Sequence, residues 1–246
     1  MAAVISAHIG YLLLTFIPPV VWLLFYLRED RHPEPKLLIL LAFAGGMGAA
    51  VAAVLAECMF VQVITGSPCR AGIMNGVHPL LLFGGIALIE EYFKYAAIKF
   101  LILRRPAFDE PIDAMIYLMT SAMGFAALEN ALFLIPVFRE STFAGLEIAA
   151  NRFLGANLLH ALSSGIVGFF LARAWWHPKR HHIILFGVLI ASVLHTLFNY
   201  LIMQQGAISQ GTFFLFMLLA VMTIVVLIDF QHLKREQPED APAPTG

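Results

Sequence analysis

Charged residues and cysteines are scarce in this sequence, and each scarcity excludes a class of protein. Asp, Glu, Lys and Arg together make up 13% of the residues, about half the share found in soluble domains. With a formal net charge of −1, the chain lacks the basic excess expected of a nucleic-acid-binding protein. Two cysteines in 246 residues supply neither a disulfide framework nor a CxxC metal site.

Long apolar runs occupy most of the sequence instead. Hydrophobic residues make up 60% of the chain and the mean hydropathy is +0.83, which indicates an integral membrane protein. Because a bilayer crossing needs about 20 apolar residues, we expect an all-α, polytopic membrane helical bundle of seven transmembrane helices. These helices are expected near residues 6–27, 37–65, 77–103, 112–136, 153–176, 182–204 and 211–230. Residues 1–235 are expected to form a single integral membrane domain, and the Pro-rich, acidic residues 236–246 a disordered cytoplasmic tail.

Lys and Arg residues are distributed unequally between the two sides of the expected bundle. Only Arg70, Arg139 and Arg152 fall in the connections on one side, whereas the other side carries nearly all the rest. Cytoplasmic loops carry the excess of basic residues, so we expect the N-terminus outside and the C-terminus in the cytoplasm. The first basic residue, Arg28, follows the first apolar run, which is the reverse of a cleaved signal peptide. The expected localisation is the cell membrane, which the chain crosses several times.

Ionisable and amide side chains interrupt four of the expected helices. On insertion scales an ionisable side chain near the middle of a span costs about 2.5–3.5 kcal/mol, so such residues usually face a cavity and mark a functional site. The members of this set are Glu90, Glu91 and Lys94 in the third helix, Glu129 and Asn130 in the fourth, His160 and Ser164 in the fifth, and His195 and Asn199 in the sixth. Three pairs are spaced i and i+4, which places both members of each pair on one helix face.

The ionisable members of this set also share one depth. At about 1.5 Å per residue, Glu91, His160 and His195 each lie roughly 20 Å above the basic end of their helices, and Glu129 roughly 24 Å. Independent structural residues would be scattered across a hydrocarbon core about 30 Å thick. We therefore expect these four side chains to meet in one site in the outer half of the membrane.

Each residue also has a structural interpretation when it is taken alone. Lys94 is suited to neutralise Glu90 in an ion pair, Ser164 to bond its own helix backbone, and Asn130 to join two helices. A single histidine in a membrane helix is often a packing hydrogen-bond partner. The matching depth of two imidazoles and three carboxylates favours a functional site over these separate interpretations.

Peptide-bond hydrolysis is one reaction that buried carboxylates and imidazoles are able to support. That reaction needs an activated water, stabilisation of the oxyanion and a proton for the leaving amine. Ser164 lies one turn from His160, but no serine or cysteine forms a convincing nucleophile arrangement with a base. A carboxylate is then the natural water-activating group. We expect Glu90 or Glu91 to be the general base, with Glu129 or His160 positioning the water.

Four short motifs occur in order on successive expected helices, namely EEYFK at 90–94, FAALEN at 125–130, HALSS at 160–164 and HTLFN at 195–199. DRHPEP follows the first helix and DEPIDAMIY precedes the fourth. In these motifs the chain resembles the PrsW-type intramembrane proteases, relatives of the CAAX prenyl proteases and of the scaffold subunit of gamma-secretase. The resemblance covers about residues 28–200, and the seventh helix and the tail carry no motif.

The resemblance implies an intramembrane endopeptidase that cuts a membrane-anchored protein near the outer membrane face. The best-known family member makes the first, outer-side cut in a membrane-bound anti-sigma factor, so a membrane-anchored protein substrate and the lipid bilayer are the implied partners. The catalytic residues implied are Glu90, Glu91, Glu129, His160, His195 and Asn199, with Lys94, Phe125, Asn130 and Ser164 supporting them. By analogy with the prenyl proteases, His195 and Asn199 donate hydrogen bonds to the oxyanion.

Alternatives to this interpretation stay open. A second way to activate water is a zinc ion bound by Glu91, His160 and His195, because two histidines and a glutamate form an established catalytic zinc set. We favour a metal-independent glutamate mechanism and assign no cofactor. A proton-coupled transporter also needs buried carboxylates and histidines at one depth, and a scaffold protein is a further alternative. Residues 137–152 are expected to form a loop that lies over the site and gates it.

Overall fold

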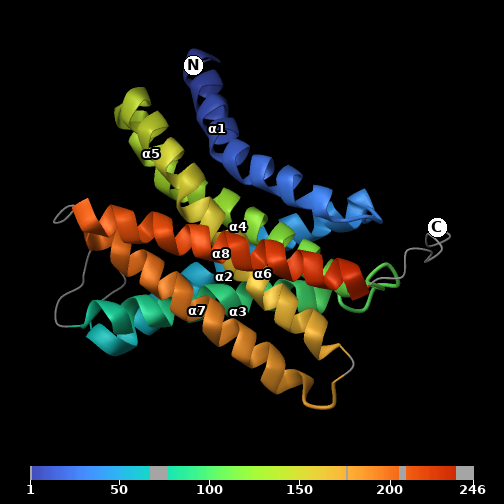
Figure 1. Cartoon of the computed structure of the whole chain (residues 1–246). Coiled ribbons are helices and arrows are strands. Elements are labelled where there is room, and N and C mark those ends of the chain that lie inside the picture. Colours follow the sequence, from blue (N-terminus) through green and yellow to red (C-terminus); the bar gives the residue numbers. More distant parts are fainter. Residues whose placement is uncertain (1, 67–76, 176, 205–208, 237–246) are drawn as a thin grey trace.

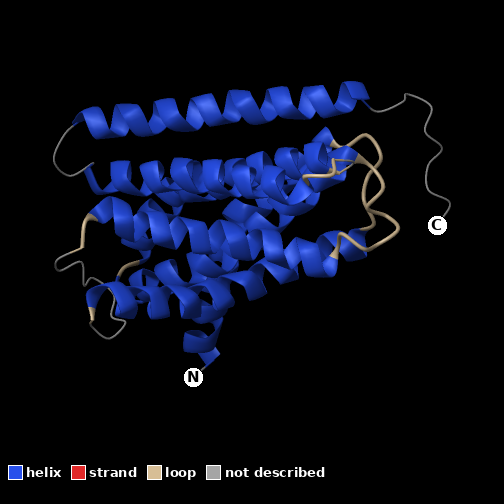
Figure 2. Ribbon diagram, turned by 90° about the horizontal axis from the view of Figure 1, so that it is seen from below, coloured by secondary structure: helices blue, strands red, loops and turns tan. Residues whose placement is uncertain are grey.

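The computed structural model describes residues 2–66, 77–175, 177–204 and 209–236, and over these residues the chain forms helices and no strands. The α-helices are α1 (Ala2–Tyr26), α2 (Lys36–Thr65), α3 (Pro79–Leu101), α4 (Pro111–Glu140), α5 (Thr142–Leu154), α6 (Ala156–Ala174), α7 (Arg180–Gln204) and α8 (Ser209–Glu236), and a 3₁₀ turn, Leu27–Glu29, follows α1. The long helices pack side by side in one bundle (Figure 1, Figure 2). The all-α prediction is confirmed, and the tail prediction for residues 237–246 lies outside the described residues.

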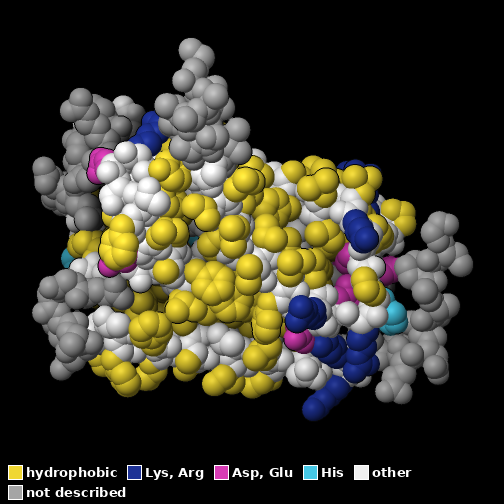
Figure 3. All heavy atoms as spheres, turned by 90° about the horizontal axis from the view of Figure 1, so that it is seen from above, with side chains coloured by type: hydrophobic (Ala, Val, Ile, Leu, Met, Phe, Trp, Pro, Cys, Tyr) yellow, Lys and Arg dark blue, Asp and Glu magenta, His cyan; other side chains and the backbone are white. Residues whose placement is uncertain are grey.

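Six segments of the described chain are long and apolar enough to cross a membrane: α1 with the 3₁₀ turn, α2, α4, α5 together with α6, α7, and α8. Helix α3 does not qualify because Glu90, Glu91 and Lys94 interrupt it, yet it packs against α2, α4 and α7 within the bundle. All seven predicted helices are therefore present. Figure 3 shows apolar side chains over the middle of the molecule and Lys and Arg gathered at one end. We call this the basic end, where α3 ends and α4 and α7 begin. Which end faces the cytoplasm stays a prediction.

Helix α4 lies at the centre of the bundle and is buried along most of its length. It crosses α2 through two reciprocal glycine contacts. A Cβ atom on Gly46 would lie 1.8 Å from the Ser121 carbonyl oxygen, and one on Gly124 would lie 1.9 Å from the Phe43 carbonyl oxygen. Small residues permit this close approach of two membrane helices. The crossing fixes the position of α4, which carries Glu129 into the interior.

The structure differs from the sequence prediction between α4 and α6. Helix α4 continues through Pro136 to Glu140, and a further helix, α5, follows it. A proline is tolerated inside a membrane helix because neighbouring groups satisfy the freed backbone atoms. Ser141 begins α5 by accepting a hydrogen bond from the backbone N–H of Ala144 at 3.3 Å. The prediction of a loop over residues 137–152 is therefore wrong.

The DRHPEP and DEPIDAMIY motifs meet at the basic end. His32 Nδ1 lies 2.8 Å from Glu110 Oε1, and the Tyr117 hydroxyl donates a hydrogen bond to Glu34. Asp113 caps α4 by accepting a hydrogen bond from the backbone N–H of Glu110 at 2.9 Å. Burial raises the pKa of the Glu34 carboxyl above its ordinary value, and the Tyr117 hydroxyl opposes that rise. The segment after α1 is thus fastened to the start of α4.

Candidate active site

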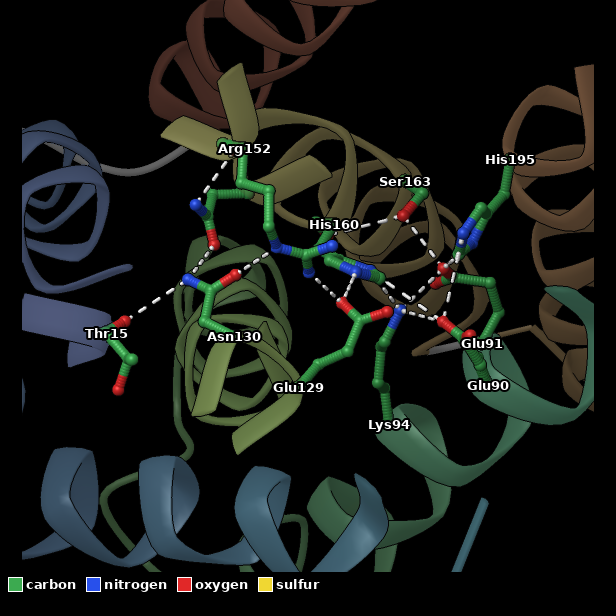
Figure 4. A network of polar contacts seen from close by, with 11 residues as sticks. Thr15, Glu90, Glu91, Lys94, Glu129, Asn130, Arg152, His160, Ser163 and His195 are labelled. Carbon is green, nitrogen blue, oxygen red and sulfur yellow. Dashed lines mark hydrogen bonds and ion pairs between the residues drawn. The ribbon is translucent and has the colours of Figure 1, made fainter. Parts of the chain in front are cut away.

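Side chains from four helices converge inside the bundle (Figure 4). The converging side chains are those of Glu90, Glu91 and Lys94 from α3, Glu129 from α4, His160 from α6 and His195 from α7. The two imidazole rings lie 5.2 Å apart between their centroids. The predicted convergence is confirmed, and the catalytic roles of these residues stay predictions.

Each imidazole is held by a carboxylate on one side of its ring. His160 Nε2 lies 2.9 Å from Glu129 Oε2, and His195 Nδ1 lies 3.0 Å from Glu91 Oε1. An ionised carboxylate only accepts hydrogen bonds, so each of these ring nitrogens donates. In a neutral imidazole the lone pair then falls on His160 Nδ1 and on His195 Nε2. Carboxylate contacts of this kind commonly orient histidines that bind a metal.

Glu90 faces the two remaining ring nitrogens. Its Oε2 lies 3.9 Å from His160 Nδ1 and 3.8 Å from His195 Nε2, and this oxygen is buried without a hydrogen-bond partner among the described residues. One ligand atom from each of the three residues lies within 4.8 Å of the other two, so the group is suited to hold a metal ion. The sequence prediction named Glu91 in a possible metal set, whereas the group whose ligand atoms meet in the structure contains Glu90.

Glu91 follows Glu90 in α3, and its side chain points about 100° away from that of Glu90 around the helix. It is fully buried. Its Oε1 accepts hydrogen bonds from Lys94 Nζ at 2.8 Å and from Ser163 Oγ at 2.9 Å. Its Oε2 accepts one from Ser164 Oγ at 3.3 Å. Together with His195 these donors surround the carboxylate. Ser164 therefore supports the site through Glu91.

Lys94 balances the charges of the neighbouring glutamates. Its Nζ lies 2.8 Å from Glu91 Oε1 and 3.5 Å from Glu90 Oε2, so the predicted ion pair is confirmed. The same atom lies 2.8 Å from His160 Nδ1 and 4.5 Å from the centroid of the Phe125 ring. Phe125 thus supports the site through a cation–π contact with Lys94.

Asn130 points away from the histidine pair and joins helices, as its structural interpretation predicted. Its Nδ2 donates to Asn157 Oδ1 at 3.0 Å and to the Thr15 carbonyl oxygen at 3.2 Å. Arg152 of α5 donates from Nε to Asn130 Oδ1 at 2.6 Å and from Nη2 to Glu129 Oε2 at 2.7 Å. Arg152, which the sequence analysis placed in an external loop, therefore positions a residue of the site.

A cavity of about 410 Å³ lies beside this cluster, and most of its lining residues are apolar. The polar residues on its wall are Glu57, Glu90, Glu129, Arg152, His160, His195 and Asn199. Glu91 is absent from the wall. The side chain of Glu129 is 21% exposed, compared with 8% for Glu90 and 0% for Glu91. The predicted residue Asn199 thus has access to a molecule in the cavity, whereas Glu91 acts only through its neighbours.

Sequence reasoning missed three residues of this site. Glu57 is a carboxylate within the apolar run of α2 and was visible by the same criterion as the others. Ser163 neighbours Ser164, but its contact with Glu91 depends on the rotation of α6. Nothing in the sequence around Arg152 indicated that it contacts the site, because this contact depends on how α5 lies over the cavity.

A helical membrane bundle that directs carboxylates and imidazoles toward a cavity has the groups that an intramembrane protease needs. Residues 34–228 match the PrsW family intramembrane metalloprotease. The chain belongs to this family, and the resemblance seen in the motifs is confirmed.

Curated relatives match over most of their length. Protease PrsW of Oceanobacillus iheyensis is 30% identical over 222 residues, which cover 89% of this chain and 93% of the relative. The Geobacillus kaustophilus protein of the same name is 28% identical and covers 74% of each chain. The Bacillus subtilis protein is 27% identical over 82% of this chain and 84% of its own. No solved structure matches. The protein is thus a multi-pass bacterial membrane protease.

Proposed function

We propose that this protein is an intramembrane metalloendopeptidase in which Glu90, His160 and His195 hold a divalent metal ion. The observation that carries the proposal is the buried Glu90 Oε2, which lacks a hydrogen-bond partner among the described residues and faces two imidazole nitrogens. Burying a carboxylate oxygen without a hydrogen bond is costly. Lys94 Nζ, 3.5 Å away, offsets part of that cost, and a cation among these three atoms offsets the rest. Zinc suits a set of two imidazoles and one carboxylate. The description of the family as a metalloprotease supports the same assignment.

The surrounding residues have separate tasks in this proposal. Glu90, His160 and His195 would hold the metal ion, which would supply Lewis-acid chemistry toward the scissile carbonyl group and the attacking water. Glu91 and Glu129 fix the tautomer and orientation of the two imidazoles. Glu129 also transfers protons, because it is the most exposed of the three carboxylates in the cluster and Arg152 holds it in place. Asn199, one turn beyond His195 on the cavity wall, donates a hydrogen bond to the oxyanion.

A metal-independent mechanism is the second candidate, and the position of Lys94 favours it. Lys94 Nζ lies 2.8 Å from His160 Nδ1 and 3.5 Å from Glu90 Oε2, so an ammonium group already places positive charge beside two of the three candidate ligand atoms. In this mechanism Glu90 is the general base, and His195 and Asn199 stabilise the oxyanion. Both candidates require Glu90, and only the metal distinguishes them.

The substrate in this proposal is a membrane-anchored protein, and an anti-sigma factor is the class that the family resemblance predicts. The amides of a transmembrane helix are satisfied within the helix, so the substrate must be unwound where it is cut. On the predicted orientation, that point lies in the outer half of the membrane.

Profiling of new protein N-termini tests the function and identifies the substrates in the same experiment. Bacterial membranes that contain the wild-type protein, Glu90→Gln or Glu147→Gln are compared at equal amounts of folded protease. Glu147 is an exposed glutamate of α5 and provides the matched control. We expect wild type and Glu147→Gln to generate the same new N-termini within or beside spans of membrane-anchored proteins, and Glu90→Gln to generate none of them. Identical N-termini with Glu90→Gln would overturn the assignment of Glu90.

A further inference from the structure

A second cavity of about 410 Å³ lies at the basic end of the bundle, away from the carboxylate cluster. Its basic residues are Lys99 of α3, Arg104 of the α3–α4 connection and Arg180 at the start of α7. Phe108 and Trp175, whose rings stack with centroids 4.4 Å apart, form part of its wall. Stacked aromatic rings beside basic side chains are typical of the membrane–water interface.

Among the residues that the structure describes, the three basic side chains of this cavity have no acidic counterpart. Lys99, Arg104 and Arg180 are all exposed, and within the described part of the chain none of them forms an ion pair. The lining of the cavity contains no Asp or Glu residue. Two other basic residues at this end are in ion pairs, Lys234 with Glu29 at 2.5 Å and Arg173 with Glu236 at 2.6 Å. Three uncompensated cations around one hollow favour an anionic ligand.

An apolar groove continues from this cavity toward the middle of the membrane. A third cavity of about 440 Å³ shares Tyr95, Lys99, His181 and Ile184 with the second one. It extends between α3 and α7 as far as Leu88, which lies roughly 16 Å from Lys99 along the helix at 1.5 Å per residue. Apart from Lys99, Tyr92, Tyr95 and His181, its lining side chains are aliphatic or phenyl groups. The charged hollow and the apolar groove therefore form one continuous surface.

We propose that this surface binds an anionic phospholipid of the bilayer. The phosphate headgroup lies among Lys99, Arg104 and Arg180, and one acyl chain follows the groove between α3 and α7. Basic pockets between membrane helices are known to bind anionic headgroups, and a free phosphate ion would leave the groove unused. Since α3 carries Glu90 and α7 carries His195, a bound lipid holds together the two helices that carry these residues. The proposal stands independently of the reaction at the active site.

Native mass spectrometry of the detergent-purified full chain tests the proposal with phosphatidylglycerol and phosphatidylcholine as probes. The pocket variant combines Lys99→Gln, Arg104→Gln and Arg180→Gln. The matched control combines Arg31→Gln, Lys36→Gln and Arg235→Gln, which remove the same charge from exposed positions outside the cavity. We expect wild type and control to retain phosphatidylglycerol in preference to phosphatidylcholine. The pocket variant should bind phosphatidylglycerol about 100-fold more weakly.

Equal losses in the two triple variants would overturn the proposal, because they would show attraction to net charge alone. Complete competition by inorganic phosphate, or equal retention of phosphatidylcholine, would also overturn it. The single variant Arg180→Glu tests the same site with less risk to folding, since Arg180 is exposed. This variant should also lose phosphatidylglycerol. Its thermal unfolding without lipid should stay close to that of wild type. Unchanged lipid binding by this variant would contradict the proposed site.

Discussion

Adjacent residues of the EEYFK motif have different surroundings and, in our proposal, different tasks. Glu90 reaches the cavity and faces two ring nitrogens, whereas Glu91 is enclosed by donors from Lys94, two serines and His195. One step along the helix rotates the side chain by about 100°, which is enough to separate a ligand of the reacting centre from a residue that positions it. Lys94 stabilises the burial of two neighbouring carboxylates by contacting both.

Substitution of Glu91 by Gln should impair the enzyme without abolishing it. The amide cannot reproduce a carboxylate that accepts from His195 and Lys94, so the imidazole loses its fixed orientation. Loss of such a supporting partner costs about 10- to 100-fold in metal affinity or activity. Glu90→Gln should abolish metal binding and activity altogether. The rate constant kcat and the metal affinity are measured on a peptide taken from a mapped cleavage site, with Glu147→Gln as control. Equal loss in Glu90→Gln and Glu91→Gln would contradict the separation of their tasks.

Residues of the site could be predicted where burial in lipid makes a polar side chain conspicuous. Glu90, Glu91, Glu129, His160 and His195 were identified in this way, and the common depth of Glu91, Glu129, His160 and His195 predicted that these four meet. The sequence prediction named Glu91 and not Glu90 as a possible metal ligand, but that choice depends on how α3 is rotated about its axis, which the sequence does not reveal. The contact of Arg152 with Glu129 depends on the packing of α5 and was equally inaccessible.

At the scale of elements, close packing of α2 against α4 sets the frame of the site. The Gly45, Gly46, Gly48 cluster was visible in the sequence, but only the structure distinguishes its members. Gly46 approaches the α4 backbone, whereas a Cβ atom on Gly48 would meet no heavy atom within 4 Å. Helix α5 was missed because its 13 residues are too few to span a bilayer, and a search for apolar spans overlooks amphipathic helices of this length.

Gly46→Ala should therefore destabilise the protein, and Gly48→Ala should not. The added methyl group of the first variant would lie 1.8 Å from the Ser121 carbonyl oxygen, which forces the helices apart at a cost of about 1–3 kcal/mol or more. Alanine at position 48 enters free space and is a better helix former by about 0.5–1 kcal/mol. Thermal unfolding in one detergent compares the pair, and equal stability of the two variants would contradict the close crossing.

Tyr117→Phe should loosen the segment after α1 in a pH-dependent manner. Burial raises the pKa of Glu34, and the Tyr117 hydroxyl lowers it again by stabilising the ionised carboxylate. At pH values above the pKa of Glu34 in the folded protein, the free energy of unfolding of the variant should be about 1–2 kcal/mol lower than that of wild type. This deficit should shrink as the pH falls and Glu34 becomes protonated. Tyr92→Phe at an exposed position is the control, and a deficit that grows on acidification would refute the assigned role of the bond.

At the scale of the whole molecule, α3 and α7 connect two chemically distinct regions. The carboxylate and imidazole cluster lies well inside the bundle, and the basic cavity lies roughly 14 Å further along α3, counted from Glu90 to Lys99. The seven long helices could be predicted because a bilayer sets their length, whereas the short helix α5 could not. The orientation rests on loop charges alone and stays a prediction, since packing within the bundle is the same for either direction of insertion.

The metal content of the purified chain tests the central claim most directly. Wild type, Glu90→Gln and Glu147→Gln are purified in detergent without chelator, and bound metals per folded chain are measured by inductively coupled plasma mass spectrometry beside the cleavage rate. We predict about one zinc ion per chain in wild type and Glu147→Gln, a large loss in Glu90→Gln, and activity that a chelator removes and zinc restores. Full cleavage by wild-type protein that carries no metal and ignores the chelator would contradict the account.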